Sequence, residues 1–263
     1  MQFFTRIINK LLQVFTRIIN TILQVKGINL GAGRGWSKIR WIGLDQVNGI
    51  MLDKNSKLPF PDSTIEFIFS EHFIEHIDNK DLDNLLNESH RVLKKGGKIR
   101  IITPNFEDIL SKYRQGDTKY FFETVGFKGR KEWKKFGVES CLENILGHWF
   151  ANYDSKDSIH DTDFYRGPPI GIEDEIKEKA YELTLEDFSQ WIVSKIPKSR
   201  YKKPHGHINW FSYDRLNMLL RDKGFMNITK SSCNQSQYLE FLDDKFDKKS
   251  RANISLYIEA EKK

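Results

Sequence analysis

A glycine-rich turn near the amino terminus has the residue types and spacing of a ligand-binding loop. Gly31, Gly33 and Gly35 stand at alternate positions directly after the short apolar run 25–30. Glycine lets the backbone approach a ligand because no Cβ lies in the way. The dinucleotide pattern G-x-G-x-x-G requires a further glycine where Trp36 stands, so the turn departs from that pattern.

Two carboxylates follow the next two apolar segments. Segment 38–44 ends at Asp45, and the shorter segment 49–52 ends at Asp53. A carboxylate at the end of the second strand of an α/β sheet is placed to accept hydrogen bonds from both hydroxyls of a ribose. The alternative is that each aspartate only caps the end of its strand.

Histidines supply candidate metal chemistry. His72, Glu75 and His76 match the H-x-x-E-H spacing of a class of zinc proteases, and that spacing brings both imidazoles to one helix face. The three residues follow directly on an expected buried strand, however. We therefore expect structural histidines, or histidines beside a cofactor, and no metal.

The segments between these residues predict an α/β fold. We expect a doubly wound, Rossmann-like sheet of seven strands, whose last two form an antiparallel hairpin, with a largely helical insertion. The expected strands are 25–30, 38–44, 49–52, 65–70, 98–103, 225–231 and 254–261, and an amphipathic helix is expected at 81–94.

The connection between the first two strands is unusually short. Eight residues separate Leu30 from Ile39, whereas a crossover with its helix takes ~10–12 residues or more. The crossover helix is therefore expected to be vestigial. A dinucleotide relies on a helix amino terminus to bind its pyrophosphate, so the truncation argues against NAD.

The chain divides into a core and two additions. We expect the core at 26–105 and 206–263, and the insertion at 106–205, which holds 17 of the 34 aromatic residues. The insertion is expected to form a lid that excludes water from the site. A helical subdomain with its own core is the alternative, and both can hold.

Residues 1–25 carry an internal repeat. Phe4–Val14 and Phe15–Val25 are identical at nine of eleven positions. Eleven residues make three helical turns, so apolar residues return to nearly the same face. We expect an amphipathic helix that covers the first strand, or alternatively an in-plane helix that makes peripheral contact with a membrane.

The charge distribution and the cysteine content indicate which binding partners and which cellular location to expect. The first 44 residues hold seven Lys or Arg and no acid, whereas the remainder has 35 basic and 36 acidic residues. We therefore expect no nucleic-acid partner, because phosphate binding requires a basic body. Two widely spaced cysteines exclude a disulfide framework and favour a cytoplasmic location. Because residues 1–25 are the amphipathic repeat, association of the protein with a membrane stays an alternative.

Several sequence blocks occur in the order and spacing of one known family. The blocks are Ile28–Gly33, Leu58–Asp62, Ser70–His76, Arg91–Gly97, His207–Asp214 and Ser255–Ala260. They resemble the class I S-adenosylmethionine-dependent methyltransferases of the type 11 group. Within that group they are similar to predicted methyltransferases often found near cell-surface glycan genes. The resemblance covers roughly residues 26–110 and 205–263.

The resemblance implies S-adenosylmethionine as the cofactor and a small-molecule or glycan-type acceptor. Gly31, Ala32 and Gly33 would pass under the methionine and ribose of the cofactor. Asp45 would hold the ribose, and Asp53 the adenine amino group.

The methionine end of the cofactor and the acceptor involve other residues. Ser70 would bind the methionine end through its backbone carbonyl, and Asn29 stands where the family usually has an acid. For a hydroxyl acceptor, His72 is the first candidate for the base, His207 the second and His148 the third. The alternative function is a non-catalytic, membrane-docked S-adenosylmethionine-binding module of the same fold.

Overall fold

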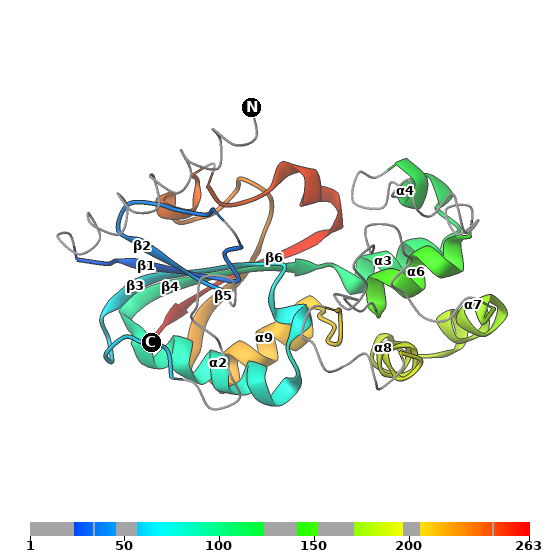
Figure 1. The fold of residues 1–263 in the computed structure, drawn as a ribbon, viewed down its shortest axis with the longest axis horizontal. Helices are drawn as coiled ribbons and strands as arrows, with labels where there is room; N and C mark the ends of the chain where they lie inside the picture. The colour runs from blue at the N-terminus through cyan, green and yellow to red at the C-terminus, as the bar shows by residue number, and fades with distance from the viewer. Residues whose placement is uncertain are drawn as a thin grey trace, which may run out of the picture.

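A single mixed sheet forms the centre of the molecule (Figure 1). The computed structural model describes residues 24–33, 35–45, 57–123, 141–151, 171–196, 206–243 and 245–263. Six strands of these residues pair in the order β2-β1-β3-β4-β6-β5. The strands are β1 (Gly27–Leu30), β2 (Trp41–Leu44), β3 (Ile65–Glu71), β4 (Leu93–Pro104), β5 (Phe225–Ser231) and β6 (Ser255–Lys262).

Parallel and antiparallel pairing divide the sheet into two parts. Strands β1 to β4 pair in parallel, whereas β6 runs antiparallel to both β4 and β5. The predicted α/β class is confirmed with this mixed sheet. The expected strand at 49–52 lies outside the described residues, so the count of seven stays a prediction.

Helices α2 (Asn79–Val92) and α9 (Tyr213–Asp222) cover one face of the sheet (Figure 1). Each begins at a side-chain cap: Asp78 accepts a hydrogen bond from the backbone of Asp81, and Ser212 from that of Arg215. Apolar residues at helical spacing are buried against the strands, as the pattern at 81–94 predicts, but the helix ends at Val92 and Leu93 already begins β4.

The connection between β5 and β6 covers the opposite face. The described residues of 31–40 form turns and no helix, in agreement with the short spacing. The ring of Trp41 on β2 instead packs against Phe246 at 4.9 Å and Phe241 at 6.2 Å between centroids. Its Nε1 donates a hydrogen bond to Glu240 Oε1 at 2.9 Å. Aromatic packing from this connection therefore takes the place of a crossover helix on β2.

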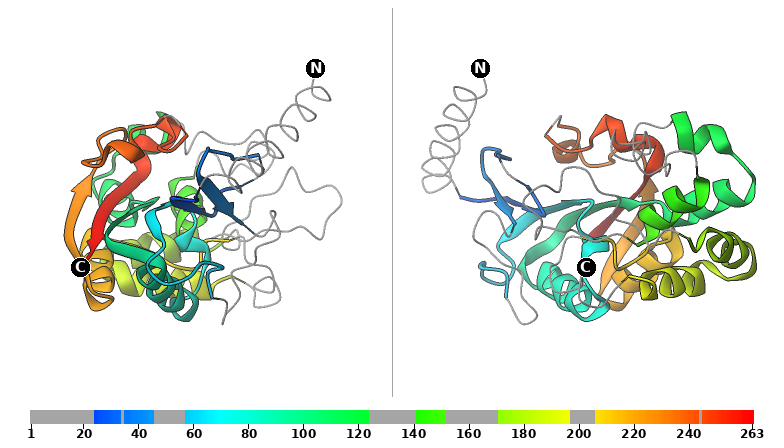
Figure 2. Two further views of the ribbon diagram at one scale, coloured as in Figure 1. Left: turned by 90° about the vertical axis from the view of Figure 1, so that its left-hand side faces the viewer. Right: turned by 45° about the vertical axis from the view of Figure 1, so that its right-hand side comes forward.

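The described part of the insertion is helical and lies beyond the carboxyl end of β4 (Figures 1 and 2). The ring of Phe150 contacts those of Phe106 and Phe188 at 5.2 and 5.0 Å between centroids, within a core continuous with that of the sheet. Arg114 donates to the carbonyl of Ala180 and so ties two of its helices together. The helices are α3 (Phe106–Arg114), α4 (Thr118–Glu123), α6 (Leu142–Phe150), α7 (Glu173–Glu182) and α8 (Leu185–Ser194).

The predicted helical character of the insertion agrees with these elements, and its role as a lid stays a prediction. Nearly all of the amino-terminal repeat, like Asp53, lies outside the described residues. Among the helices that the structure does describe, none combines the length and the apolar character needed to cross a membrane.

Candidate functional site

The order of the strands creates a switch point between β1 and β3. From β1 the chain continues to β2 on one side, while the neighbour on the other side is β3. Ligands of open α/β sheets bind outside the carboxyl ends of the strands at such a point. Leu30 and Ser70 are paired there, near the ends of β1 and β3. The glycine turn and the segment that follows β3 therefore lie next to each other.

The carboxylate of Asp45 closes the glycine turn. Its Oδ2 accepts a hydrogen bond of 2.7 Å from the backbone of Gly33. The carbonyl of Leu44 accepts two more, from Gly31 at 2.8 Å and from Ala32 at 3.3 Å. The φ angles of Gly31 and Gly33 are 71° and 69°, in the left-handed region that glycine adopts without strain. Four of the predicted cofactor-binding residues are thus brought together.

One side of the turn is packed and the other is open. A methyl group built on Gly31 would come within 2.5 Å of the Phe73 ring, whereas one built on Gly33 or Gly35 would meet no described atom within 4 Å. Among the described residues, space for a ligand therefore lies beside Gly33 and Gly35. Ser70 adds a buried hydroxyl that has no hydrogen-bond partner in the described part of the chain. These features fit a nucleoside-type cofactor.

The other predicted cofactor contacts lie beside this corner or outside the described residues. Asn29 is buried within β1, in register with Gly43 of β2 and Phe69 of β3. Its role at the methionine end of the cofactor stays a prediction. Asp53 lies outside the described part of the chain.

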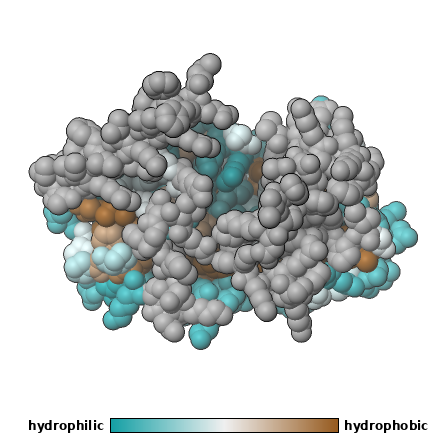
Figure 3. Space-filling model, viewed as in Figure 1, coloured by the Kyte–Doolittle hydropathy of each residue, from teal (hydrophilic) through white to brown (hydrophobic). Residues whose placement is uncertain are grey.

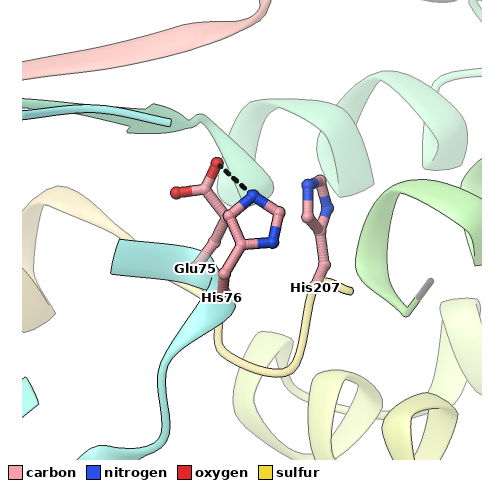
Figure 4. Close-up of side chains that lie close together, drawn as sticks. All are labelled: Glu75, His76 and His207. Atoms are coloured by element: carbon pink, nitrogen blue, oxygen red, sulfur yellow. Dashed lines mark ion pairs between the residues drawn. The ribbon is translucent and has the colours of Figure 1, made fainter. Parts of the chain in front are cut away.

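A second group of polar side chains follows β3. Glu75 and His76 lie on the 3₁₀ helix η2 (Ile74–His76), and His207 comes alongside from the segment before α9 (Figure 4). One ligand-type atom from each side chain lies within 4.8 Å of the others. Glu75 Oε1 is 3.8 Å from His76 Nε2, and the two imidazole centroids are 5.0 Å apart.

Backbone carbonyls orient both imidazoles of this group. His76 Nδ1 lies 3.0 Å from the carbonyl oxygen of Gly206, and His207 Nδ1 lies 2.5 Å from that of Trp149. A carbonyl oxygen only accepts, so each Nδ1 carries the donated proton, and Nε2 of the neutral ring presents a lone pair. Burial lowers the pKa of His207 well below its ordinary value, which keeps that ring neutral.

Glu75, the one acid of this group, is deeply buried. Its side chain is 0% exposed, and neither carboxyl oxygen has a hydrogen-bond partner of good geometry among the described residues. Burial raises the pKa of Glu75 to about 8. Oε1 of Glu75 lies 3.4 Å from Nδ1 of His72 and 3.8 Å from Nε2 of His76. Without a cation beside it, this carboxyl therefore favours its protonated form near neutral pH.

His72, the first predicted base, is buried beside this group. Its Nε2 is 2.8 Å from Ser255 Oγ and its Nδ1 faces Glu75, so both ring nitrogens face protein groups. Burial lowers its pKa well below the ordinary value. Its φ of 48° is rare for a residue with a Cβ and marks the end of β3 as a strained position.

His76 belongs to this group, although it was not among the predicted bases. His76 has a side chain 26% exposed and lies between Glu75 and His207. The H-x-x-E-H spacing contained it, but nothing in that spacing indicated the approach of His207. His148, the third predicted base, lies on α6 next to Trp149, whose carbonyl binds His207.

Part of the sequence matches a known protein family. Residues 38–101 match the model of a family described as a methyltransferase domain. This stretch contains Asp45, β3, the Glu75–His76 segment and α2. The match confirms the methyltransferase resemblance, and the cofactor of such a domain is S-adenosylmethionine. No curated protein matches the sequence.

Several solved structures of S-adenosylmethionine-dependent methyltransferases are similar to this chain. One from Methanosarcina mazei is 14% identical, covers 93% of this chain and 96% of its own, and has a TM-score of 0.41. One from Mesorhizobium loti is 14% identical, with coverages of 94% and 96% and a TM-score of 0.40. One from Archaeoglobus fulgidus is 13% identical, with coverages of 98% and 94% and a TM-score of 0.38. Scores this low carry no argument about function.

Proposed function

We propose that this protein is an S-adenosylmethionine-dependent methyltransferase that acts on a small-molecule or glycan-type acceptor. The observation that carries the proposal is the contact between Asp45 and the glycine turn at the switch point, within a chain that matches a methyltransferase domain. The residues proposed to bind the cofactor are Asn29, Gly31, Ala32, Gly33, Asp45, Asp53 and Ser70.

The chain's own groups suit the parts of this cofactor. The carboxylate of Asp45 is an acceptor for ribose hydroxyls, and the open backbone at Gly33 admits the nucleoside without steric conflict. Asn29 offers a neutral amide in place of an acid, so it binds an ammonium group without a charge–charge contribution. The bound cofactor supplies an electrophilic methyl group.

The acceptor side is assigned to the segment that follows β3. Alignment of acceptor and methyl group can lower the barrier by ~7–11 kcal/mol. For a hydroxyl acceptor, we propose that His72 or His207 removes the proton. In His207 the N–H at Nδ1 donates to the carbonyl of Trp149, so Nε2 is the nitrogen that can accept a proton, whereas in His72 Nε2 faces Ser255 and Nδ1 faces Glu75.

The acceptor class follows from the resemblance and from charge. Beyond the amino-terminal 44 residues the chain carries no excess of basic residues, and a polyanion requires such an excess. Hydrophilic surface is visible near the centre of the view in Figure 3. A polar small molecule or sugar suits such a surface better than a nucleic acid does.

Calorimetric titration with S-adenosylhomocysteine and S-adenosylmethionine tests the proposal directly. We expect one saturable site for each ligand, and absence of heat with both would refute the proposal. Release of S-adenosylhomocysteine in the presence of polar small-molecule and glycan acceptors then tests turnover. The alternative, a membrane-docked module without transfer activity, is favoured by Asn29 and by the missing crossover helix. It predicts cofactor binding without product and sedimentation with anionic vesicles that depends on residues 1–25.

A further inference from the structure

We propose that Glu75, His76 and His207 bind a divalent transition-metal ion, for which Zn²⁺ is the simplest candidate. The proposal concerns a site separate from the cofactor corner and does not depend on methyl transfer. From the sequence alone we expected no metal. The structure adds a third ligand, His207, from a distant part of the chain.

The donor set suits such an ion. Two imidazole nitrogens with one carboxylate oxygen form a ligand set that zinc enzymes and non-haem iron enzymes use. Mg²⁺ and Ca²⁺ prefer oxygen ligands. The three side chains of the cluster offer two nitrogens and one carboxylate within 4.8 Å of one another. The chemistry therefore selects a transition metal over a hard cation.

The groups behind the ligands orient them as in known metal sites. A histidine that binds a metal almost always donates its other N–H to a carbonyl or carboxylate. His76 and His207 both donate through Nδ1 to backbone carbonyls, those of Gly206 and Trp149. Both rings therefore present Nε2 lone pairs. Nδ1 of His72 lies 3.4 Å from Oε1 of Glu75, the oxygen that also faces His76.

Burial supplies an independent argument. Glu75 is 0% exposed, and its oxygens lack a hydrogen-bond partner of good geometry among the described residues. A buried carboxylate is unfavourable unless a proton or a cation compensates its charge. One proton can join Glu75 to only one imidazole at a time. A divalent ion compensates the charge and binds the lone pairs of His76 and His207 together.

The spacing of the cluster implies a small contraction on binding. Bonds of ~2.0–2.1 Å to a tetrahedral ion place its ligands roughly 3.3 Å apart, whereas the present separations extend to 4.8 Å. The partly exposed side chain of His76 gives an ion access from solvent. Three protein ligands leave a coordination position open, which is the arrangement of catalytic rather than structural zinc sites.

The site also lies close to the cofactor corner. Phe73, two positions before Glu75, packs against the glycine turn at Gly31. If the proposed function holds, an ion at this site would lower the pKa of a hydroxyl group bound to it. With the ion in place, His207 is a ligand, and the ion replaces it as the group that activates the acceptor.

Metal binding is tested on the full chain after dialysis against a chelator. Zn²⁺ affinity is measured by competition with a chromophoric chelator, and Co²⁺ by its visible absorption spectrum. We expect one equivalent of each ion with micromolar or tighter affinity, nitrogen-type Co²⁺ bands, and an increase in the melting temperature with Zn²⁺ but not with Mg²⁺. Absence of stoichiometric binding of Zn²⁺, Co²⁺, Mn²⁺ and Fe²⁺ would overturn the proposal and favour a protonated Glu75 that donates to His76.

Variants then locate the ion. Glu75→Gln and His207→Gln should each weaken Zn²⁺ binding at least 100-fold. His90→Gln is the matched control, because His90 lies on α2 against Phe225 and outside the cluster. Unchanged binding in both cluster variants would overturn the assignment. If a variant does not fold, the Co²⁺ spectrum of the wild-type chain still tests the proposed ligand set. Titration of the same samples with S-adenosylhomocysteine tests the methyltransferase proposal separately.

Discussion

The backbone N–H of Gly33 donates a hydrogen bond of 2.7 Å to Oδ2 of Asp45. This contact joins the end of β2 to the turn that follows β1, without a helix between them among the described residues. The carboxylate therefore both shapes the glycine turn and stands at its edge. Its two roles, in conformation and in ligand binding, can be separated by substitution.

Substitution of Asp45 should weaken cofactor binding in a graded way. Asp45→Ala removes the acceptor for Gly33 and for ribose hydroxyls, and charge-assisted hydrogen bonds contribute about 1.5–3 kcal/mol each. We expect S-adenosylhomocysteine to bind roughly 10–100-fold more weakly by calorimetry, with a smaller loss for Asp45→Asn, which keeps an oxygen acceptor. Wild-type affinity in Asp45→Ala would contradict the assigned role.

A methyl group at position 33 should obstruct the ligand more than it harms the fold. Gly33 and Gly116 have φ angles of 69° and 68°, and a Cβ on either meets no described atom within 4 Å. Alanine at either site should therefore cost a similar conformational strain of about 1–2 kcal/mol in thermal unfolding. Only Gly33→Ala should also reduce S-adenosylhomocysteine affinity. Equal affinities in the two variants would show that the ligand does not lie over the turn.

Glu88 should stabilise the protein in a pH-dependent manner. Its Oε2 accepts hydrogen bonds from the backbone of Leu58 at 2.7 Å and from Arg91 at 2.6 Å, so it holds the turn that precedes β3 against α2. The side-chain hydrogen bond from Arg91 lowers the pKa of Glu88. A lowered pKa in the folded state contributes stability above the unfolded-state pKa, and this contribution is lost as pH falls through the folded-state value.

We therefore expect Glu88→Gln to reduce the free energy of unfolding by about 1–3 kcal/mol near neutral pH and by less in acid. Urea unfolding at a series of pH values measures the difference. Asp62→Asn is the control, because the Asp62 side chain is 77% exposed in its ion pair with Arg91 and should change stability by less than about 1 kcal/mol. A Glu88→Gln cost that is independent of pH would contradict the assigned ionic role.

Phe246 should be a large contributor to stability. Its ring packs on Trp41 at 4.9 Å and on Phe69 at 4.6 Å between centroids, on the sheet face opposite α2 and α9. Phe246→Ala should lower the free energy of unfolding by about 3–5 kcal/mol, because it leaves a cavity over the sheet. Leu239→Ala, at a side chain 86% exposed in the same connection, should have little effect. A small loss in Phe246→Ala would mean that β2 does not depend on this connection.

Local sequence pattern predicted most strands to within a few residues. The expected ranges 65–70 and 225–231 correspond to β3 and β5 as observed, because apolar residues bounded by turn residues carry the signal within each segment. The range 38–44 was too long: residues 38–40 form a turn, with Arg40 at a φ of 64°. Packing of Trp41 under the β5–β6 connection decides where β2 begins, and no local pattern encodes that contact.

The candidate site shows the same division. The glycine turn and Asp45 could be recognised from the sequence because both follow adjacent strands, and the carboxyl ends of parallel strands meet at one edge of a sheet. The approach of His207 to Glu75 and His76 could not, since the hydrogen bond that fixes His76 already spans 130 positions of the chain. Short-range spacing determines which side chains share a strand end or a helical turn. Only the closing of the fold brings distant imidazoles to a buried carboxyl, because that proximity depends on the packing of whole elements.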